Sequence, residues 1–234
     1  EISACLVGSE MCIRDSHTTN LHLGPMGYIV PLYDPLRILE EAATLDHVLA
    51  GRFELGLVSG VVPRYFGPYK ADWNNRRARA IEAVRVIKTA FASDHGCFSF
   101  EGEFHKYNEV QLSVMPVQKP HPPLWLQSSE PETLKFLANE GVNTGYLLLA
   151  PREPVAERYR TYLRDWRAAG HTRRPNIAYW TLAYVDETDE AAEAIAGPEI
   201  EYTFSQVARF GGAVTKQSDQ SLHQLSGGGI SPVD

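Results

Sequence analysis

Short apolar runs alternate with longer stretches of helical period along most of the chain. The apolar runs predict buried strands, because such runs between turn residues are typical of a parallel sheet that is covered by helices. They lie at residues 21–31, 52–60, 124–127, 144–149 and 176–185. Helices are predicted after Asp34, after Asn75, over residues 131–140, around residues 155–166 and from about residue 186.

One helix start can be read directly from two residues. Asp34 is followed by Pro35; aspartate is a preferred N-cap residue, and proline fits the first position of a helix. Apolar residues then recur on one face as far as Gly51, and glycine is the residue that most often follows the end of a helix. The sequence therefore predicts a capped helix between Asp34 and Gly51.

Residues 96–123 interrupt this alternation. They read as short antiparallel strands that end in a proline-rich approach to the strand at 124–127. The strands and helices on either side indicate a parallel α/β fold. No G-x-G-x-x-G turn or P-loop marks a doubly wound sheet, so a TIM (β/α)8 barrel is the better prediction. We count about six strands against the eight of a full barrel, which predicts an incomplete barrel with a short antiparallel insertion.

The two ends of the chain depart from this pattern. Residues 1–16 show neither strand nor helix periodicity, and part of the stretch resembles a translated sequencing adapter. We expect 1–16 to be foreign or disordered; a natural flexible N-terminus is the alternative. Residues 211–234 are polar and rich in glycine, which predicts a disordered tail. The expected barrel domain is therefore 17–210.

Composition narrows the class of protein. Hydrophobic residues make up 44% of the chain and charged residues 22%, as in ordinary globular domains. The net charge of −7 argues against nucleic acid or an anionic membrane as a partner. No apolar run approaches the roughly 20 residues of a membrane span. The chain has three cysteines and no zinc-like spacing, which predicts a reduced, cytoplasmic protein without a structural metal.

The turn that leads into the helix at 131–140 is rich in small hydroxyl residues. From spacing alone, Ser129 would be the N-cap of that helix, and Glu132 would complete a capping box three residues later. The other interpretation is an anion site, because a helix that starts after a barrel strand offers free N–H groups. Glu130 and Glu132 argue against an anion, since they compete for the same positive helix end.

Two separated motifs carry a resemblance to a known family. The first is PLYDPLRILEEAATLDHVLAGRFELGLVSGVVPRYFG at residues 31–67, and the second is PVQKPHPPLW at residues 116–125. Over about residues 18–205, the chain resembles the bacterial luciferase-like, flavin-dependent monooxygenases. The family fold is a (β/α)8 barrel with an insertion. Family elements are expected before Leu21 and after Thr203, so the resemblance implies a fragment that lacks both ends.

The resemblance implies a flavin-dependent enzyme. We expect a monooxygenase that uses reduced FMN and O2 to oxygenate a small apolar organic substrate, with the reduced flavin supplied by a separate reductase. A homodimer is compatible with this expectation. The nearest alternative is a hydride-transfer enzyme that uses the deazaflavin F420 on the same scaffold. A non-catalytic flavin-binding protein is a second class of function, and a truncated reading frame without a function of its own is a third.

The resemblance also implies where the cofactor binds. One family turn holds the flavin phosphate through hydroxyl groups, and one glycine loop offers backbone N–H groups while its small residue lets the flavin approach. In this sequence the matching residues are Ser128, Ser129 and Thr133 in the turn, and Ser59, Gly60 and Val61 in the loop. Without the resemblance, the loop would be an ordinary turn after a strand.

No catalytic residue is assigned. His22, His95 and His105 are expected to be structural or exposed to solvent, because histidine has many uses other than catalysis. The resemblance places the proton-handling histidine of the luciferase branch on an early strand, in the part that the chain is expected to lack.

Overall fold

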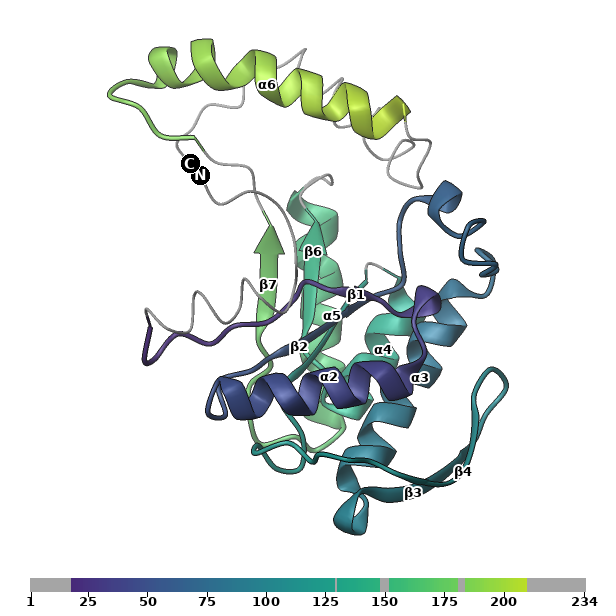
Figure 1. Ribbon diagram of the computed structural model, residues 1–234. Coiled ribbons are helices and arrows are strands. Elements are labelled where there is room, and N and C mark those ends of the chain that lie inside the picture. Colours follow the sequence, from purple (N-terminus) through teal and green to yellow (C-terminus); the bar gives the residue numbers. More distant parts are fainter. Residues whose placement is uncertain (1–17, 129, 148–151, 181–183, 210–234) are drawn as a thin grey trace.

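Among the residues that the structure describes, five parallel strands form the centre of the fold. The computed structural model describes residues 18–128, 130–147, 152–180 and 184–209 (Figure 1). Within them, β1 (Tyr28–Ile29), β2 (Leu55–Val58) and β5 (Leu124–Gln127) pair side by side, as do β6 (Thr144–Leu147) and β7 (Ile177–Trp180). Asn143 joins the two groups: it donates its N–H to Leu124 and accepts a hydrogen bond from Leu126.

The strand order identifies the fold class. The strands follow one another as β1-β2-β5-β6-β7, so each new parallel strand is added on the same side of the previous one. This sequential order is that of a (β/α)8 barrel, whereas a doubly wound sheet reverses direction at its centre. The predicted fold, a partial luciferase-like barrel, is confirmed, with five parallel strands among the described residues against the six or so counted in the sequence.

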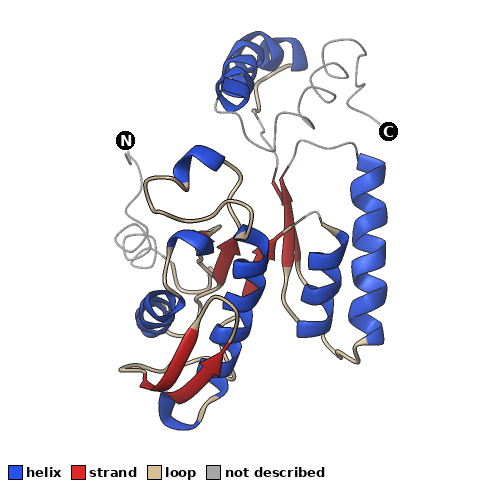
Figure 2. Ribbon diagram, turned by 90° about the vertical axis from the view of Figure 1, so that its right-hand side faces the viewer, coloured by secondary structure: helices blue, strands red, loops and turns tan. Residues whose placement is uncertain are grey.

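Helices that follow the strands supply the other half of the core. These are α2 (Pro35–Val48), α3 (Arg76–Ala92), α4 (Pro131–Glu140) and α5 (Arg152–Ala168), and Figure 2 shows them flanking the strands. Leu55 and Leu57 of β2, like Leu124 and Leu126 of β5, are at most 1% exposed and belong to one continuous core with these helices. The last described helix, α6 (Asp189–Arg209), lies beyond the carboxyl ends of β6 and β7 (Figure 1).

The predicted antiparallel insertion is present. β3 (Cys97–Glu101) and β4 (Lys106–Gln111) form a hairpin between α3 and β5. The predicted start of α2 is also confirmed: the Asp34 carboxylate accepts the N–H of Leu36 at 2.9 Å, and Pro35 is the first helical residue. The expectations for residues 1–16 and 211–234 lie outside the described residues.

Two glycines let the first strands approach closely. A Cβ atom on Gly56 would lie 1.8 Å from the carbonyl oxygen of Pro25, and one on Gly24 would lie 1.9 Å from that of Glu54. No side chain fits at such distances, so the close approach of the segment before β1 to the start of β2 depends on glycine at both positions. This contact helps to position the end of β2, from which the first candidate loop departs.

Candidate functional site

The two candidate loops follow neighbouring strands at the same edge of the sheet. β2 and β5 are paired in parallel, with Val58 opposite Gln127. The next residues, Ser59 and Ser128, therefore leave the sheet side by side, since neighbouring strands lie about 4.8 Å apart. Both serines are half-buried. The structure thus brings Ser59 and Ser128, one residue from each predicted set, together at the carboxyl ends of the strands, where active sites of barrel enzymes lie.

The loop after β2 depends on a glycine. Gly60 is buried and has a φ of +87°, a backbone conformation that residues with a side chain rarely adopt. A Cβ atom there would also lie 2.8 Å from the ring of Phe66. The following Val61 is 50% exposed. The loop is therefore tightly turned at Gly60 and open to solvent one residue later.

The capping box predicted around Ser129 is wrong. The N-cap of α4 is Glu130, with ψ 127°, and the helix begins at Pro131. The reason is steric: a residue before proline is pushed out of the helical region, so the helix cannot start earlier than the proline. Ser128 acts instead as a local acceptor, its Oγ taking the N–H of Glu130 at 3.1 Å. Ser129 itself lies outside the described residues.

The start of α4 offers hydrogen-bond donors toward this turn. Glu132 and Thr133 are the second and third residues of the helix, and N–H groups at these positions have no carbonyl partner within a helix. The Thr133 side chain is 6% exposed, whereas Ser128 is half-buried. Of the Ser128 and Thr133 hydroxyl groups, that of Ser128 is thus the more accessible to a ligand.

Two arginines at the start of α3 lie beside the turn. Arg77 Nη2 is 2.7 Å from the Glu130 carboxylate. Arg76 stacks over the ring of Trp73, with its guanidinium carbon 3.7 Å from the ring centre, and donates Nη1–H to the Trp73 carbonyl. Burial lowers the pKa of Arg76, and the charge of Arg77 lowers it further, while Glu130 opposes this. Two positive charges therefore lie beside the turn, together with the negative charge of Glu130 and that of Glu132 in the first turn of α4.

Sequence reasoning missed these arginines, although a signal was present. Cations at the N-terminus of a helix face the positive end of its dipole, which is unfavourable. Arg76 and Arg77 are the first two residues of α3. A pair of arginines at such a position indicates a nearby anion, and the structure supplies one in Glu130.

The three histidines considered in the sequence lie away from this edge. His22 Nδ1 is 3.2 Å from Glu54, near the amino end of β2. His95 accepts a hydrogen bond at its carbonyl from Gln111, beside the hairpin. His105 is buried in the hairpin turn. The expectation of structural or exposed roles is consistent with these positions.

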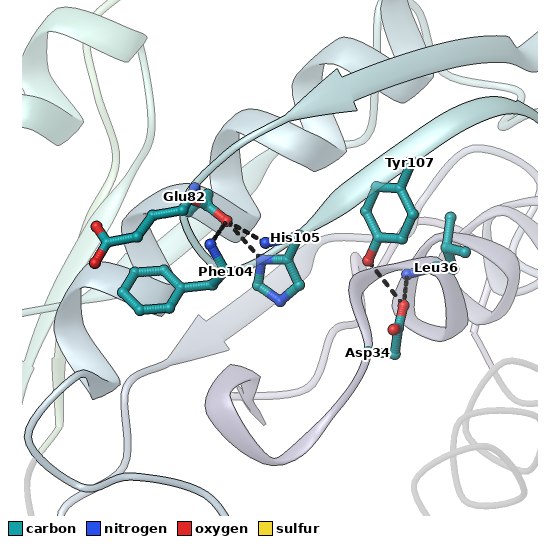
Figure 3. A network of polar contacts seen from close by, with 7 residues as sticks. Asp34, Leu36, Glu82, Phe104, His105 and Tyr107 are labelled. Carbon is teal, nitrogen blue, oxygen red and sulfur yellow. Dashed lines mark hydrogen bonds and ion pairs between the residues drawn. The ribbon is translucent and has the colours of Figure 1, made fainter.

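A buried polar cluster holds the hairpin (Figure 3). The Glu82 carboxylate is 7% exposed and accepts the backbone N–H groups of Glu103, Phe104 and His105 at 2.7–2.9 Å. His105 Nδ1 lies 2.9 Å from the same carboxylate. Burial raises the pKa of Glu82, but these hydrogen bonds outweigh it and hold that pKa below its ordinary value. Since all partners come from the hairpin turn, the cluster is structural.

A large cavity lies on another flank of the molecule. It measures about 1260 Å³ and runs beside β1 and α2, with Tyr28, Tyr33, Tyr65 and Tyr69 in its walls. It shares no residue with the two candidate sets. Within the described residues, β1 has no strand on its outer side, so the cavity marks an uncovered flank of the sheet.

The described residues contain neither a metal cluster nor a membrane-spanning helix. Among them, no group of three or more histidine, cysteine, aspartate or glutamate side chains is arranged to hold a metal ion. In the same part of the chain, no helix is both long enough and apolar enough to cross a membrane.

Several solved structures share this fold. The monooxygenase RslO1 from Streptomyces bottropensis matches 92% of this chain and 65% of its own, with a TM-score of 0.80 and 22% identity. The oxygenating constituent of 3,6-diketocamphane monooxygenase from Pseudomonas putida, in complex with FMN, matches 96% of this chain and 64% of its own, with a TM-score of 0.73 and 18% identity. An F420-dependent secondary alcohol dehydrogenase matches 94% and 67%, with a TM-score of 0.69 and 18% identity. At these identities the likeness concerns the fold alone.

Two relatives in sequence are named as flavin-dependent monooxygenases. The oxygenase component of the flavin-dependent trigonelline monooxygenase of Acinetobacter baylyi is 24% identical over 76% of this chain and 50% of its own length. The FMNH2-dependent dimethylsulfone monooxygenase of Pseudomonas putida is 25% identical over 80% of this chain and 53% of its own. The chain spans 35% to 53% of the length of the first curated relatives that it matches.

The family model for luciferase-like monooxygenases matches residues 11–229, which is most of the chain. That match includes the two motifs, the five strands and both candidate loops. The chain therefore belongs to the luciferase-like monooxygenase family, a family of enzymes.

Proposed function

We propose that the chain is part of a flavin-dependent monooxygenase that uses reduced FMN and O2 to oxygenate a small apolar organic substrate. One observation carries this proposal. The loop Ser59–Val61 and the turn from Ser128 to the start of α4 follow paired strands at the same edge of the sheet. The trigonelline and dimethylsulfone enzymes are flavin-dependent monooxygenases, which supports the same reaction class.

The residues present fit a phosphate monoester. A phosphate is recognised by N–H groups at a helix start, by hydroxyl donors and by arginine. The turn offers the N–H groups of Glu132 and Thr133, the hydroxyl of Ser128 and the guanidinium of Arg77. Ser128 keeps its own O–H free to donate when its oxygen accepts the Glu130 N–H. The donor set therefore suits the phosphate end of FMN.

The loop after β2 would receive the remainder of the cofactor. The ring of Phe66 fills the space beside Gly60, so the cofactor would approach this loop at its open end, where Val61 is 50% exposed. Reduced FMN, when bound, supplies the two electrons that allow O2 to give one oxygen atom to the substrate and the other to water. The described part of the protein would bind and orient that cofactor at the barrel edge.

The partners follow from this reaction. The trigonelline enzyme is described as an oxygenase component, which supports a separate flavin reductase in the present case as well. We also propose a reduced, cytoplasmic setting, on the basis of the cysteine usage. We further propose a homodimer, which a measurement of the molar mass in solution would test.

The first test compares FMN with riboflavin, which lacks the phosphate. We expect FMN to bind about tenfold or more tightly, since one hydrogen bond to a charged group contributes roughly 1.5–3 kcal/mol. Replacing Ser128 and Ser129 with alanine should remove most of that preference. The ratio of the two affinities is the readout, because a general loss of folded protein lowers the binding of both ligands equally. Fluorescence titration measures it.

Ser93→Ala is the control for this experiment. The Ser93 hydroxyl bonds Ala90 at the other end of α3, so the FMN to riboflavin ratio should not change. Equal losses of both ligands in the Ser128 and Ser129 variants would show that these serines only shape the turn. Titration with F420, and the spectrum of whatever cofactor binds, separates the monooxygenase from the F420-dependent alternative that one solved neighbour represents.

A further inference from the structure

Glu130 is an unusual residue to find at the start of α4. It occupies the N-cap, yet its side chain makes no hydrogen bond to the helix that it precedes. Its N–H is held by Ser128, and the following proline keeps its backbone extended. Capping of the helix therefore does not account for its carboxylate.

The carboxylate is engaged across the turn instead. It lies 2.7 Å from Arg77 Nη2. The charge of the nearby Arg76 also interacts electrostatically with Glu130. An arginine pair beside free helix N–H groups is the arrangement that binds phosphate. The Glu130 carboxylate thus already forms an ion pair with an arginine that a ligand phosphate would also bind.

We propose that Glu130 acts as an internal competitor of the flavin phosphate for Arg77, and so lowers the preference of the protein for FMN over riboflavin. This inference rests on the proposed function, because it concerns the same turn. The inference goes beyond the proposed function because it names a residue of this chain that opposes cofactor binding.

The geometry makes this competition reversible. The side chains of Arg77 and Glu130 are 47% and 42% exposed, and ion pairs this open to water are weak. A phosphate carries more charge than a carboxylate and has more acceptor oxygens, so it can displace Glu130 from Arg77. Glu130 therefore reduces the affinity for the phosphate without closing the site.

The test is the Glu130→Gln variant of the whole chain, titrated with FMN and with riboflavin. Glutamine keeps the size of the side chain and removes its charge. We expect FMN to bind about three- to tenfold more tightly than to the wild type, the range expected for losing a weak ion pair and a like charge. Riboflavin affinity and the melting temperature should stay unchanged.

Two further variants identify the mechanism. Glu132→Gln removes the same charge from the first turn of the same helix, where no contact with Arg77 is formed in the described structure, and should give a smaller gain. Arg77→Gln should weaken FMN, and in that background Glu130→Gln should lose most of its effect. The coupling between the two substitutions measures the competition directly.

The outcomes separate this inference from the proposed function. If the wild type prefers FMN but Glu130→Gln binds it equally or less tightly, Glu130 is no competitor and the inference fails alone. If neither protein distinguishes FMN from riboflavin, the turn is not a phosphate site, and both proposals fail together.

Discussion

At the scale of single residues, Glu82 shows how one side chain can organise a distant loop. It lies in the middle of α3, and its partners lie 21 to 23 residues further along the chain. Its ionised form is stabilised in the folded protein, because the N–H groups of the hairpin turn hold its pKa below the ordinary value. Folding therefore gains stability from this carboxylate above the ordinary glutamate pKa of about 4.3, and loses it as the pH falls through the lowered value.

We predict that Glu82→Gln lowers the free energy of unfolding at pH 7 by about 2 kcal/mol, since it weakens several charge-assisted hydrogen bonds in a buried site. The difference from the wild type should shrink as the pH falls below the ordinary glutamate pKa of about 4.3, where the unfolded protein takes up a proton at Glu82, and then through the lowered pKa of the folded protein. Urea unfolding at several pH values measures both effects. Glu157→Gln, on the exposed surface of α5, is the control and should have little effect. A difference that persists unchanged at low pH would contradict the prediction.

Glu82 could not be identified from the sequence. It follows Ile81 and precedes Ala83 in a helical stretch, where a glutamate normally faces solvent. Its role depends on a hairpin turn whose position is fixed only in three dimensions. The arginine pair at the start of α3 is different, because the helix dipole argument could have singled out Arg76 and Arg77 without any structure.

At the scale of elements, the two proline-led helices show which helix starts can be predicted. Pro35 and Pro131 each occupy the first helical position. The start of α2 was predicted correctly because the residue before Pro35 is an aspartate that can cap. The bounds of α4 were predicted correctly as 131–140, but its N-cap was placed one residue early, because the serine was given more weight than the steric effect of proline on the residue before it. Local rules therefore sufficed once the stronger one was applied.

The same comparison yields a prediction for Asp34. This carboxylate accepts the N–H of Leu36 and also the hydroxyl of Tyr107 from β4 (Figure 3). Asp34→Ala should lower the free energy of unfolding by about 2–3 kcal/mol, about 1 for the cap and the rest for the lost partner of Tyr107.

Tyr107→Phe serves as the partner variant in that experiment. Alone it should lower the free energy of unfolding by about 1 kcal/mol, and in the Asp34→Ala background it should add almost nothing. Urea unfolding of the four proteins gives the coupling. Strictly additive losses would show that Asp34 and Tyr107 act independently.

At the scale of the whole molecule, the parallel, barrel-type fold was the property that the sequence predicted best, whereas the site could not be assembled from local patterns. Alternating strands and helices were enough to indicate a parallel barrel-like sheet. The meeting of Ser59 with Ser128 required knowledge that β2 and β5 are neighbours, although about 65 residues and a hairpin separate them. Only the family resemblance suggested that both loops serve one cofactor. Pattern alone could not, because a hydroxyl-rich turn is also a normal way to begin a helix.

One further prediction concerns the first residues of the chain. The described core begins with Leu23 and Tyr28, and its other members come from later elements. Deleting residues 1–16, which lack any periodicity that would bury them, should therefore change the melting temperature by less than about 2 °C. Differential scanning calorimetry of both chains measures this. A fall of many degrees would show that the deleted residues pack against the core.

The way in which the β3–β4 hairpin is attached determines how far its sequence can vary or be engineered. Most of the bonds that reach Glu82 come from backbone N–H groups, which every residue except proline can supply. A substituted hairpin would need a glycine where Gly102 lies, because a Cβ atom there would be 2.5 Å from the Glu82 carboxylate, and it would need a hydroxyl to meet Asp34. Other positions facing solvent on β3 and β4 are free to vary. The insertion, which packs against α3, is thus a module whose solvent-facing positions can carry a foreign recognition sequence, provided that the buried Phe98 is kept.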